Sequence, residues 1–258
     1  MIVMIDTHCH LDYEEYENLE EVIQEMDGYM IVSGVNRKTN EQVIELCHKY
    51  NHIYGTIGFH PEYAKEFNQT EYERLKEQLQ EEKIVGVGEI GLDYHYGKED
   101  MEVQKNVFQK QILLAQSYQM PIVVHSRDAI MDTYTMLKEH HIEKYPSVLH
   151  CYSSSVEMAF EFLKLNMKFG IGGVVTFKNA GKLKDVVTQL PLCSLLLETD
   201  SPYLTPEPFR GERNKPSNVK YVAEKIAELR EISVIQVRKE TTKNACEVFH
   251  LTIPQEEL

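Results

Sequence analysis

The sequence has few cysteines, and none of them stands close to another. Its 258 residues contain five cysteines, with no C-x-x-C pair. An odd number of isolated cysteines is typical of reduced thiols, and it argues against a disulfide framework or a cysteine-ligated zinc site. We therefore expect a cytoplasmic protein with free thiols.

Long hydrophobic runs are also absent. No apolar stretch approaches the ~18 residues that a membrane-spanning helix requires. No basic region precedes an apolar core at the N-terminus, where polar Asp6 and His8 follow after only a few residues. The sequence therefore predicts neither a signal peptide nor contact with a membrane.

Positive charge is scarce as well. The net charge is −14 and the pI is about 5.3. A protein that binds long duplex nucleic acid needs clustered Lys and Arg to neutralise phosphates. The acidic net charge therefore argues against an extended basic surface of this kind. A small site in which bound cations supply the positive charge is not excluded.

Short apolar runs alternate with amphipathic stretches along the whole chain. The expected strands cover residues 1–5, 30–32, 53–57, 84–89, 121–125, 147–150, 168–175 and 194–197. The expected helices cover residues 14–26, 41–50, 70–83, 100–119, 129–141, 156–165, 181–190, 218–230 and 234–249. Eight strands alternating with helices predict an α/β protein with a (β/α)8 TIM barrel, as a single domain over residues 1–258.

Ionisable residues recur where the expected strands end. The predicted metal ligands are His8, His10, Glu89, His125, His150 and Asp200. In a barrel of parallel strands the carboxyl ends share one rim, so side chains from distant segments converge there. Asp6 and Glu198 stand in the same zone.

Four imidazoles and two carboxylates favour divalent metal ions. Zinc and manganese accept such ligands, and magnesium can fill a weaker second position. Six ligands exceed one tetrahedral site, so we expect two ions ~3.5–4 Å apart, bridged by the two oxygens of Glu89. The attacking group is then a metal-bound hydroxide, oriented or deprotonated by Asp200. Ser126 and Ser153 more plausibly cap helices than act as nucleophiles.

Five separated motifs resemble the TatD-like metal-dependent deoxyribonucleases of the amidohydrolase superfamily. The motifs are Asp6-Thr7-His8-Cys9-His10-Leu11-Asp12, Gly58-Phe59-His60-Pro61, Val87-Gly88-Glu89-Ile90-Gly91-Leu92-Asp93-Tyr94, Pro121-Ile122-Val123-Val124-His125-Ser126-Arg127 and Glu198-Thr199-Asp200-Ser201-Pro202-Tyr203-Leu204. The resemblance implies a TIM barrel in which the six predicted ligands bind divalent metal. It also implies hydrolysis of phosphodiester bonds in DNA, as a 3′-end exonuclease.

Three further residues are candidates for holding substrate. The resemblance implies that His60 contacts the scissile phosphate. Arg127 is placed for a bidentate phosphate contact, although a helix-cap salt bridge is an alternative. Arg213 lies in the loop 206–217, which either holds phosphate or is merely solvated.

Two other functions compete with a nuclease acting on single-stranded or frayed DNA ends. The same metals could serve a hydrolase of small lactones, amides or organophosphates, and fold and metals alone do not decide between them. His60, Arg127 and the loop 206–217 favour phosphate. A non-catalytic nucleic-acid-binding protein with structural metal is the third reading, but structural zinc sites are usually closed by four ligands.

Overall fold

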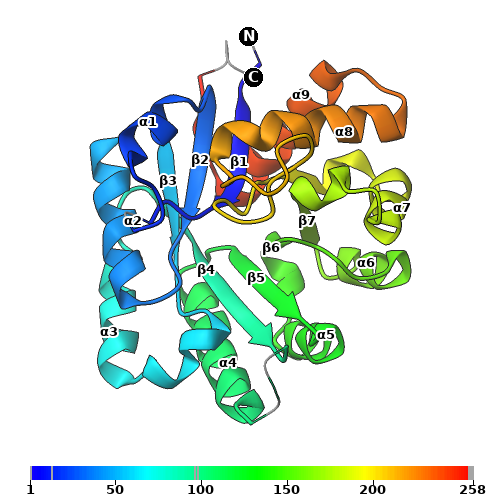
Figure 1. Ribbon diagram of the computed structural model, residues 1–258. Coiled ribbons are helices and arrows are strands. Elements are labelled where there is room, and N and C mark those ends of the chain that lie inside the picture. The colour runs from blue at the N-terminus through cyan, green and yellow to red at the C-terminus, as the bar shows by residue number, and fades with distance from the viewer. Residues whose placement is uncertain (1, 13, 96, 98, 255–258) are drawn as a thin grey trace. The chain divides into compact units, whose positions relative to one another are not determined.

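The computed structural model describes residues 2–12, 14–95, 97 and 99–254. Its strands are β1 Met4–Cys9, β2 Gly28–Ser33, β3 Ile53–Ile57, β4 Ile84–Asp93, β5 Ile122–Arg127, β6 Ser147–Leu149, β7 Met167–Ile171 and β8 Leu195–Leu197. They form one eight-stranded sheet in the order of the chain, and the neighbouring strands whose register is defined run parallel. Figure 1 shows the strands in this order of colour, with helices between them.

The helices alternate with the strands as the sequence predicts. They are α1 Leu19–Gln24, α2 Arg37–Lys49, α3 Gln69–Gln78, α4 Met101–Ser117, α5 Ile130–Glu139, α6 Val156–Leu163, α7 Gly181–Gln189, α8 Val219–Arg230 and α9 Val234–Phe249. Short 3-10 turns occupy Pro61–Glu66, Ile142–Lys144, Gly173–Thr176, Leu192–Ser194 and Pro216–Asn218. Side-chain caps fix several starts: Asn36 and Thr39 form a capping box at α2, and Ser233 and Gln236 form another at α9.

Contacts between Cα atoms divide the chain into two compact units. The first unit comprises residues 1–32, 150–163 and 168–258, and the second comprises residues 33–149 and 164–167. The predicted domain range of 1–258 stays a prediction. Each unit contains buried apolar residues and its own group of polar residues near strand ends.

In the first unit, the last helix braces the first and last strands. Asn244 of α9 donates to the backbone carbonyls of Leu192 and Leu195, at 3.0 and 2.8 Å. Thr242 donates to the carbonyl of Val3 at 2.9 Å. At the other end of these strands, Thr7 Oγ1 donates to the carbonyl of Leu197 at 2.9 Å. β1 and β8 are thus tied together at the end that carries His8 and Asp200.

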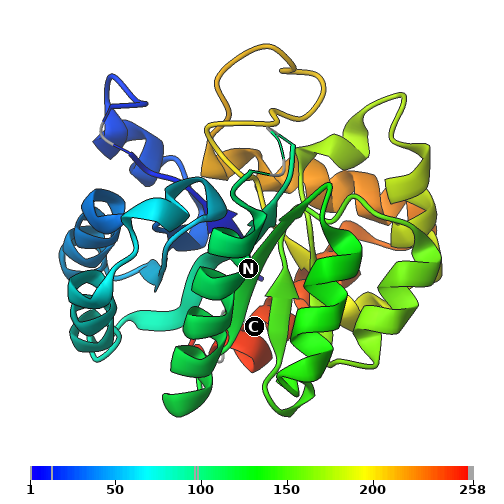
Figure 2. The same cartoon turned by 90° about the horizontal axis from the view of Figure 1, so that it is seen from below.

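Figure 2 shows the loop that follows β8 as an open gold trace beside α8.

In the second unit, β4 is longer than the sequence predicts. The expected strand ends at Glu89, whereas β4 continues to Asp93, paired with Arg127 of β5. The register between β4 and β5 shifts between Val87 and Ile90, and Gly91 then adopts a φ of +146°. A Cβ at Gly91 would meet the carbonyl oxygen of His125. Glycine therefore lets the strand continue past an irregularity that would end it for other residues.

The first strand also lies further along the chain than expected. β1 begins at Met4, so Asp6 and His8 are part of the strand instead of following it. Met1 lies outside the described residues. Among those residues, no helix is both long and apolar enough to cross a bilayer. The five cysteines, all of them described, are free thiols. The cytoplasmic location stays a prediction.

Gly91→Ala should destabilise the protein by about 2–4 kcal/mol, because it combines a left-handed backbone with a steric clash. Urea unfolding followed by circular dichroism measures this. Gly181→Ala is the control, since a Cβ there meets nothing within 4 Å and Gly181 begins α7. A loss below about 1 kcal/mol for Gly91→Ala would contradict the assigned geometry.

Candidate metal centre

Two imidazoles and a carboxylate converge at the end of β1 in the first unit. His8 Nε2 and His10 Nε2 are 3.2 Å apart, and Asp200 Oδ1 lies 3.7 Å from the former and 3.6 Å from the latter. These ligand atoms all lie within 4.8 Å of one another. The structure therefore brings together three residues that the sequence predicts as metal ligands, although His8 and Asp200 lie 192 positions apart in the chain (200 − 8).

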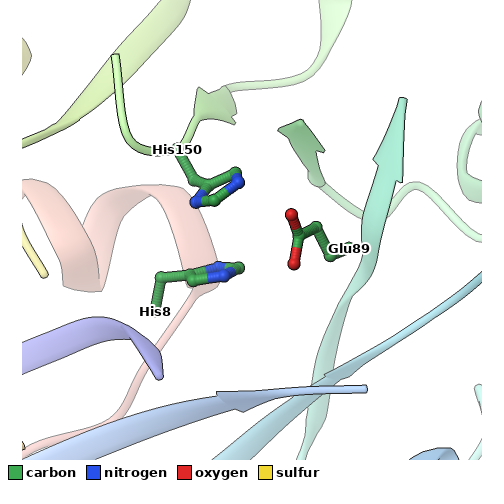
Figure 3. Close-up of side chains that lie close together, drawn as sticks. All are labelled: His8, Glu89 and His150. Carbon is green, nitrogen blue, oxygen red and sulfur yellow. The ribbon is translucent and has the colours of Figure 1, made fainter. Parts of the chain in front are cut away.

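His150 of the same unit packs on this group. Its ring stacks on that of His8, with centroids 4.0 Å apart and planes inclined by 21°. Figure 3 shows the two rings face to face. Both histidines are buried, His8 completely. The stacking fixes the plane of each ring.

Asp6, which is fully buried, holds the two strand ends in register. Its carboxylate accepts hydrogen bonds from Thr199 N at 3.0 Å, Thr199 Oγ1 at 2.6 Å and His8 N at 3.3 Å. The amide of Asp200 in turn donates to the carbonyl of His8 at 2.9 Å. Asp6 therefore acts on the backbone on both sides of the candidate ligands and is not itself one of them.

The histidines also affect the protonation of Asp200. Burial alone would raise its pKa, but a hydrogen bond from His10 and the charges of His150, His8 and His10 hold the pKa below its ordinary value. Asp200 is consequently ionised at neutral pH, which is the state a cation requires.

A second group of donors forms in the second unit. His125 Nδ1 lies 2.9 Å from Glu89 Oε1, and His125 Nε2 lies 3.0 Å from Asp93 Oδ2. His60 Nε2 lies 3.5 Å from Glu89 Oε1. Ligand atoms of His60, Asp93 and His125 lie within 4.8 Å of one another. Glu89 and Asp93 are almost completely buried.

Hydrogen bonding assigns a donor role to His60. Its Nδ1 accepts from the amide of Glu62 at 3.2 Å, so the proton of the neutral ring lies on Nε2. That N–H faces Glu89. A ring in this tautomer can donate to a carboxylate or phosphate oxygen, whereas Nε2 has no lone pair for a metal ion. This supports the predicted role of His60 in substrate binding.

Buried amide side chains hold the segments that carry these groups. Asn40 exchanges two hydrogen bonds with the backbone of Gly58, at 3.0 and 3.1 Å. Gln111 does the same for Phe59, at 2.8 and 3.0 Å, and Gln104 for Asp93, at 2.9 and 2.8 Å. Because such paired bonds fix both position and orientation, His60 and Asp93 stand on rigid backbone.

Sequence reasoning did not select Asp93, Asp6 or these amides as site residues. Asp93 was missed because the predicted strand ended four residues earlier. The amides lie on helices, where Gln and Asn are usually solvated, and only their burial distinguishes them. Asp6 lies near a strand end, where the sequence predicts metal ligands. Its position in the sequence does not show whether it binds metal or forms hydrogen bonds that hold the backbone.

The donor sets fit divalent cations. In the first unit, only one of two neutral imidazole nitrogens 3.2 Å apart can donate to the other, whereas a cation can accept the lone pairs of both. Imidazole nitrogen with carboxylate oxygen is a donor set that zinc and manganese prefer. The ligand assignments of the six predicted residues nevertheless stay predictions.

The predicted phosphate-binding arginines occupy different surroundings. Arg127 ends β5 and is exposed, with its backbone paired to Asp93. Arg213 is half exposed, lies 3.6 Å from Glu15 and sits 6.0 Å from the ring centre of Tyr16. In the same loop Lys215 pairs with Glu25. Acidic side chains therefore compensate most of the loop's positive charge, as expected if the loop is solvated and does not hold phosphate.

His125 should make the metal-free protein sensitive to alkaline pH. Burial alone would lower its pKa, but hydrogen bonds and charge from Asp93 and Glu89 raise the pKa to about 9. A raised folded pKa stabilises the protein fully below the unfolded value of about 6.5, and this stabilisation disappears as the pH rises through 9. We expect a loss on the order of 3 kcal/mol across this window in chelated protein, measured by urea unfolding. His125→Gln should remove that dependence, and an unchanged profile would refute the assignment.

Comparison with known proteins agrees with this geometry. The sequence profile of the family described as TatD related DNase matches residues 5–250. YabD of Bacillus subtilis, named an uncharacterized metal-dependent hydrolase, is 44% identical, and the match covers 96% of this chain and 100% of YabD. YcfH of Escherichia coli, with the same description, is 33% identical, with 96% of each chain covered.

Structural comparison gives the same result. The crystal structure of YjjV, a TatD homologue from Escherichia coli, matches with a TM-score of 0.89 at 32% identity, covering 96% of this chain and 98% of YjjV. This likeness and the strand order confirm the predicted (β/α)8 TIM-barrel fold class. The chain belongs to the TatD family of metal-dependent hydrolases.

Proposed function

We propose that this hydrolase is a deoxyribonuclease that removes nucleotides from the ends of single-stranded or frayed DNA. One observation carries the proposal: in the first unit, two imidazoles and a carboxylate, those of His8, His10 and Asp200, place ligand atoms within 4.8 Å of one another. The family name, TatD related DNase, points to the same substrate.

The proposed cofactor is a pair of divalent ions, with zinc, manganese or magnesium as candidates. His8, His10 and Asp200 of the first unit would hold one ion, and Glu89 and His125 of the second unit would contribute to another. From the sequence, His150 is a further predicted ligand, and the two carboxylate oxygens of Glu89 are predicted to be shared between the ions. When bound, such ions lower the pKa of water and neutralise charge that develops on a phosphate.

The chain's own residues have separate roles in this proposal. Asp200, ionised and partly exposed beside His10, would orient the attacking water and take its proton. His60 presents an N–H from Nε2 and would donate it to a phosphate oxygen. Arg127 is exposed at the end of β5 and would hold a second oxygen through its planar guanidinium.

A preference for strand ends follows from charge. A protein of net charge −14 repels a polyanion over most of its surface. Arg213 and Lys215 are paired with Glu15 and Glu25, so little excess positive charge remains in their loop. Only the few phosphates near the reacting bond can then be contacted.

Asp200→Asn should lower kcat by at least about 100-fold and change KM much less, because it removes a proton acceptor used in the transition state. Release of nucleotides from end-labelled single-stranded DNA, with each candidate metal, measures both constants. Asp185→Asn, the same change on the exposed face of α7, is the matched control and should leave them unchanged. The deoxyribonuclease proposal fails if the wild-type protein, loaded with metal, releases no nucleotide. A loss confined to KM would remove Asp200 from the chemistry.

Binding to single-stranded DNA should weaken with salt as expected for about two to four phosphate contacts, at a log–log slope of roughly −0.7 per contact. The titration uses Asp200→Asn protein with metal present, beside wild-type digestion of linear and closed circular DNA. A slope equivalent to six or more contacts, or circles cut as fast as linear strands, would contradict end recognition.

A further inference from the structure

We propose that Glu198 is a positioning residue that fixes the proton and the orientation of the His150 ring, so that this ring can bind a metal ion. Glu198 directly follows β8, lies two residues before Asp200 and is fully buried. Its Oε1 accepts a hydrogen bond from the amide of Cys151 at 2.6 Å and lies 3.9 Å from His150 Nδ1. All of these residues belong to the first unit.

The fold makes room for this carboxylate. Gly170 of β7 lies against it, and a Cβ at position 170 would collide with Glu198 Oε2. A Cβ at Gly172 would instead stand in ordinary contact, 3.7 Å from Glu198 Cγ. Burying an ionisable group is costly unless it gains specific partners. Gly170 leaves space for the carboxylate, and the amide of Cys151 donates a hydrogen bond to it. Both features indicate that the fold is adapted to a carboxylate at position 198.

The position of the Glu198 carboxyl group favours one form of His150. At 3.9 Å, Glu198 Oε1 is too far from Nδ1 for a hydrogen bond, but a carboxylate acceptor on this side of the ring favours the neutral tautomer with the proton on Nδ1, which leaves the lone pair on Nε2. Metal-binding histidines usually have such a carboxylate or carbonyl on the other ring nitrogen. The stack on His8 holds the plane of the same ring (Figure 3). Tautomer and plane are thus set by two different neighbours.

Glu198 is better explained this way than as a further ligand. Three groups of possible metal ligands occur among the described residues, and Glu198 is in none of them. Its Oε1 is already engaged by the Cys151 amide. Asp200, in contrast, lies with His8 and His10 and retains 14% side-chain exposure. The two acidic residues of the Glu198-Thr199-Asp200 segment therefore have different functions.

This inference rests on the proposed metal site, and its test separates the two. Zinc and manganese affinities are measured by competition with a chelator for wild type, Glu198→Gln and the control Glu224→Gln, which lies on the exposed face of α8. Glu198→Gln should weaken binding of the more loosely held ion by about 10–100-fold, as expected when the partner of a metal-bound histidine is lost. Glu224→Gln should bind like wild type.

A spectroscopic readout excludes a merely structural role. The ¹⁵N shifts of the His150 ring in the metal-free protein report which nitrogen carries the proton. We expect protonated Nδ1 in wild type, and a mixture of tautomers in Glu198→Gln. Unfolding in urea shows whether the variant remains folded.

A second variant perturbs Glu198 without replacing it. Gly170→Ala should displace the carboxylate and weaken metal binding in the same direction, whereas Gly181→Ala should not, because a Cβ there meets nothing within 4 Å. If Gly170→Ala does not fold, adding Glu198→Ala should restore folding by removing the clash.

The outcomes are distinct. A wild-type protein that binds no divalent metal would overturn the proposed metal site, and the role of Glu198 with it. Wild-type binding that Glu198→Gln leaves unchanged, with the same His150 tautomer, would overturn the role of Glu198 alone. A variant that only loses stability while retaining wild-type metal affinity would also overturn it.

Discussion

The candidate site depends on one buried carboxylate, that of Asp6, which joins the first and last strands of the barrel. It accepts hydrogen bonds from the backbone and hydroxyl of Thr199 and from the backbone of His8. These strands lie at opposite ends of the sequence, yet their joint orients His8 and Asp200 toward each other. Without this connection, nothing would hold the imidazole of His8 and the carboxylate of Asp200, 192 residues apart in the chain, in a defined relative position.

Such an arrangement has an electrostatic cost, which hydrogen bonds offset only in part. Burial raises the pKa of Asp6 to about 7, although the bonds from Thr199 and His8 act against it. Asp200 is held ionised by the histidines, and His125 is held protonated by Asp93 and Glu89. In the metal-free chain, the protonated imidazole of His125 therefore balances charge on Asp93 and Glu89. A divalent cation at His125 would have to replace a proton, so metal binding there should release protons.

Much of this site was predictable because its residues follow the strand pattern. The six predicted ligands stand at apolar-to-polar transitions, and the β/α alternation alone places such transitions on one rim. What the sequence did not show depends on local irregularity. β4 continues to Asp93 only because Gly91 adopts a left-handed conformation, and no propensity indicates that. Gln104 and Gln111 are polar residues on a helix, and only their burial reveals that they support the backbone beside Asp93 and His60.

The loop after β8 shows a second reason why the sequence does not predict the whole site. Arg213 is a candidate phosphate ligand by position, and Lys215 lies in the same loop, but acidic partners in the segment 15–25 determine the environment of both side chains. Such pairing between distant parts of the chain cannot be read from one sequence without the fold. Little uncompensated positive charge remains on Arg213 and Lys215, and the net charge of the whole protein is −14. For the proposed nuclease activity this implies an order of binding: the negative charge would repel a polyanionic strand until cations occupy the site, so metal should bind first and DNA second.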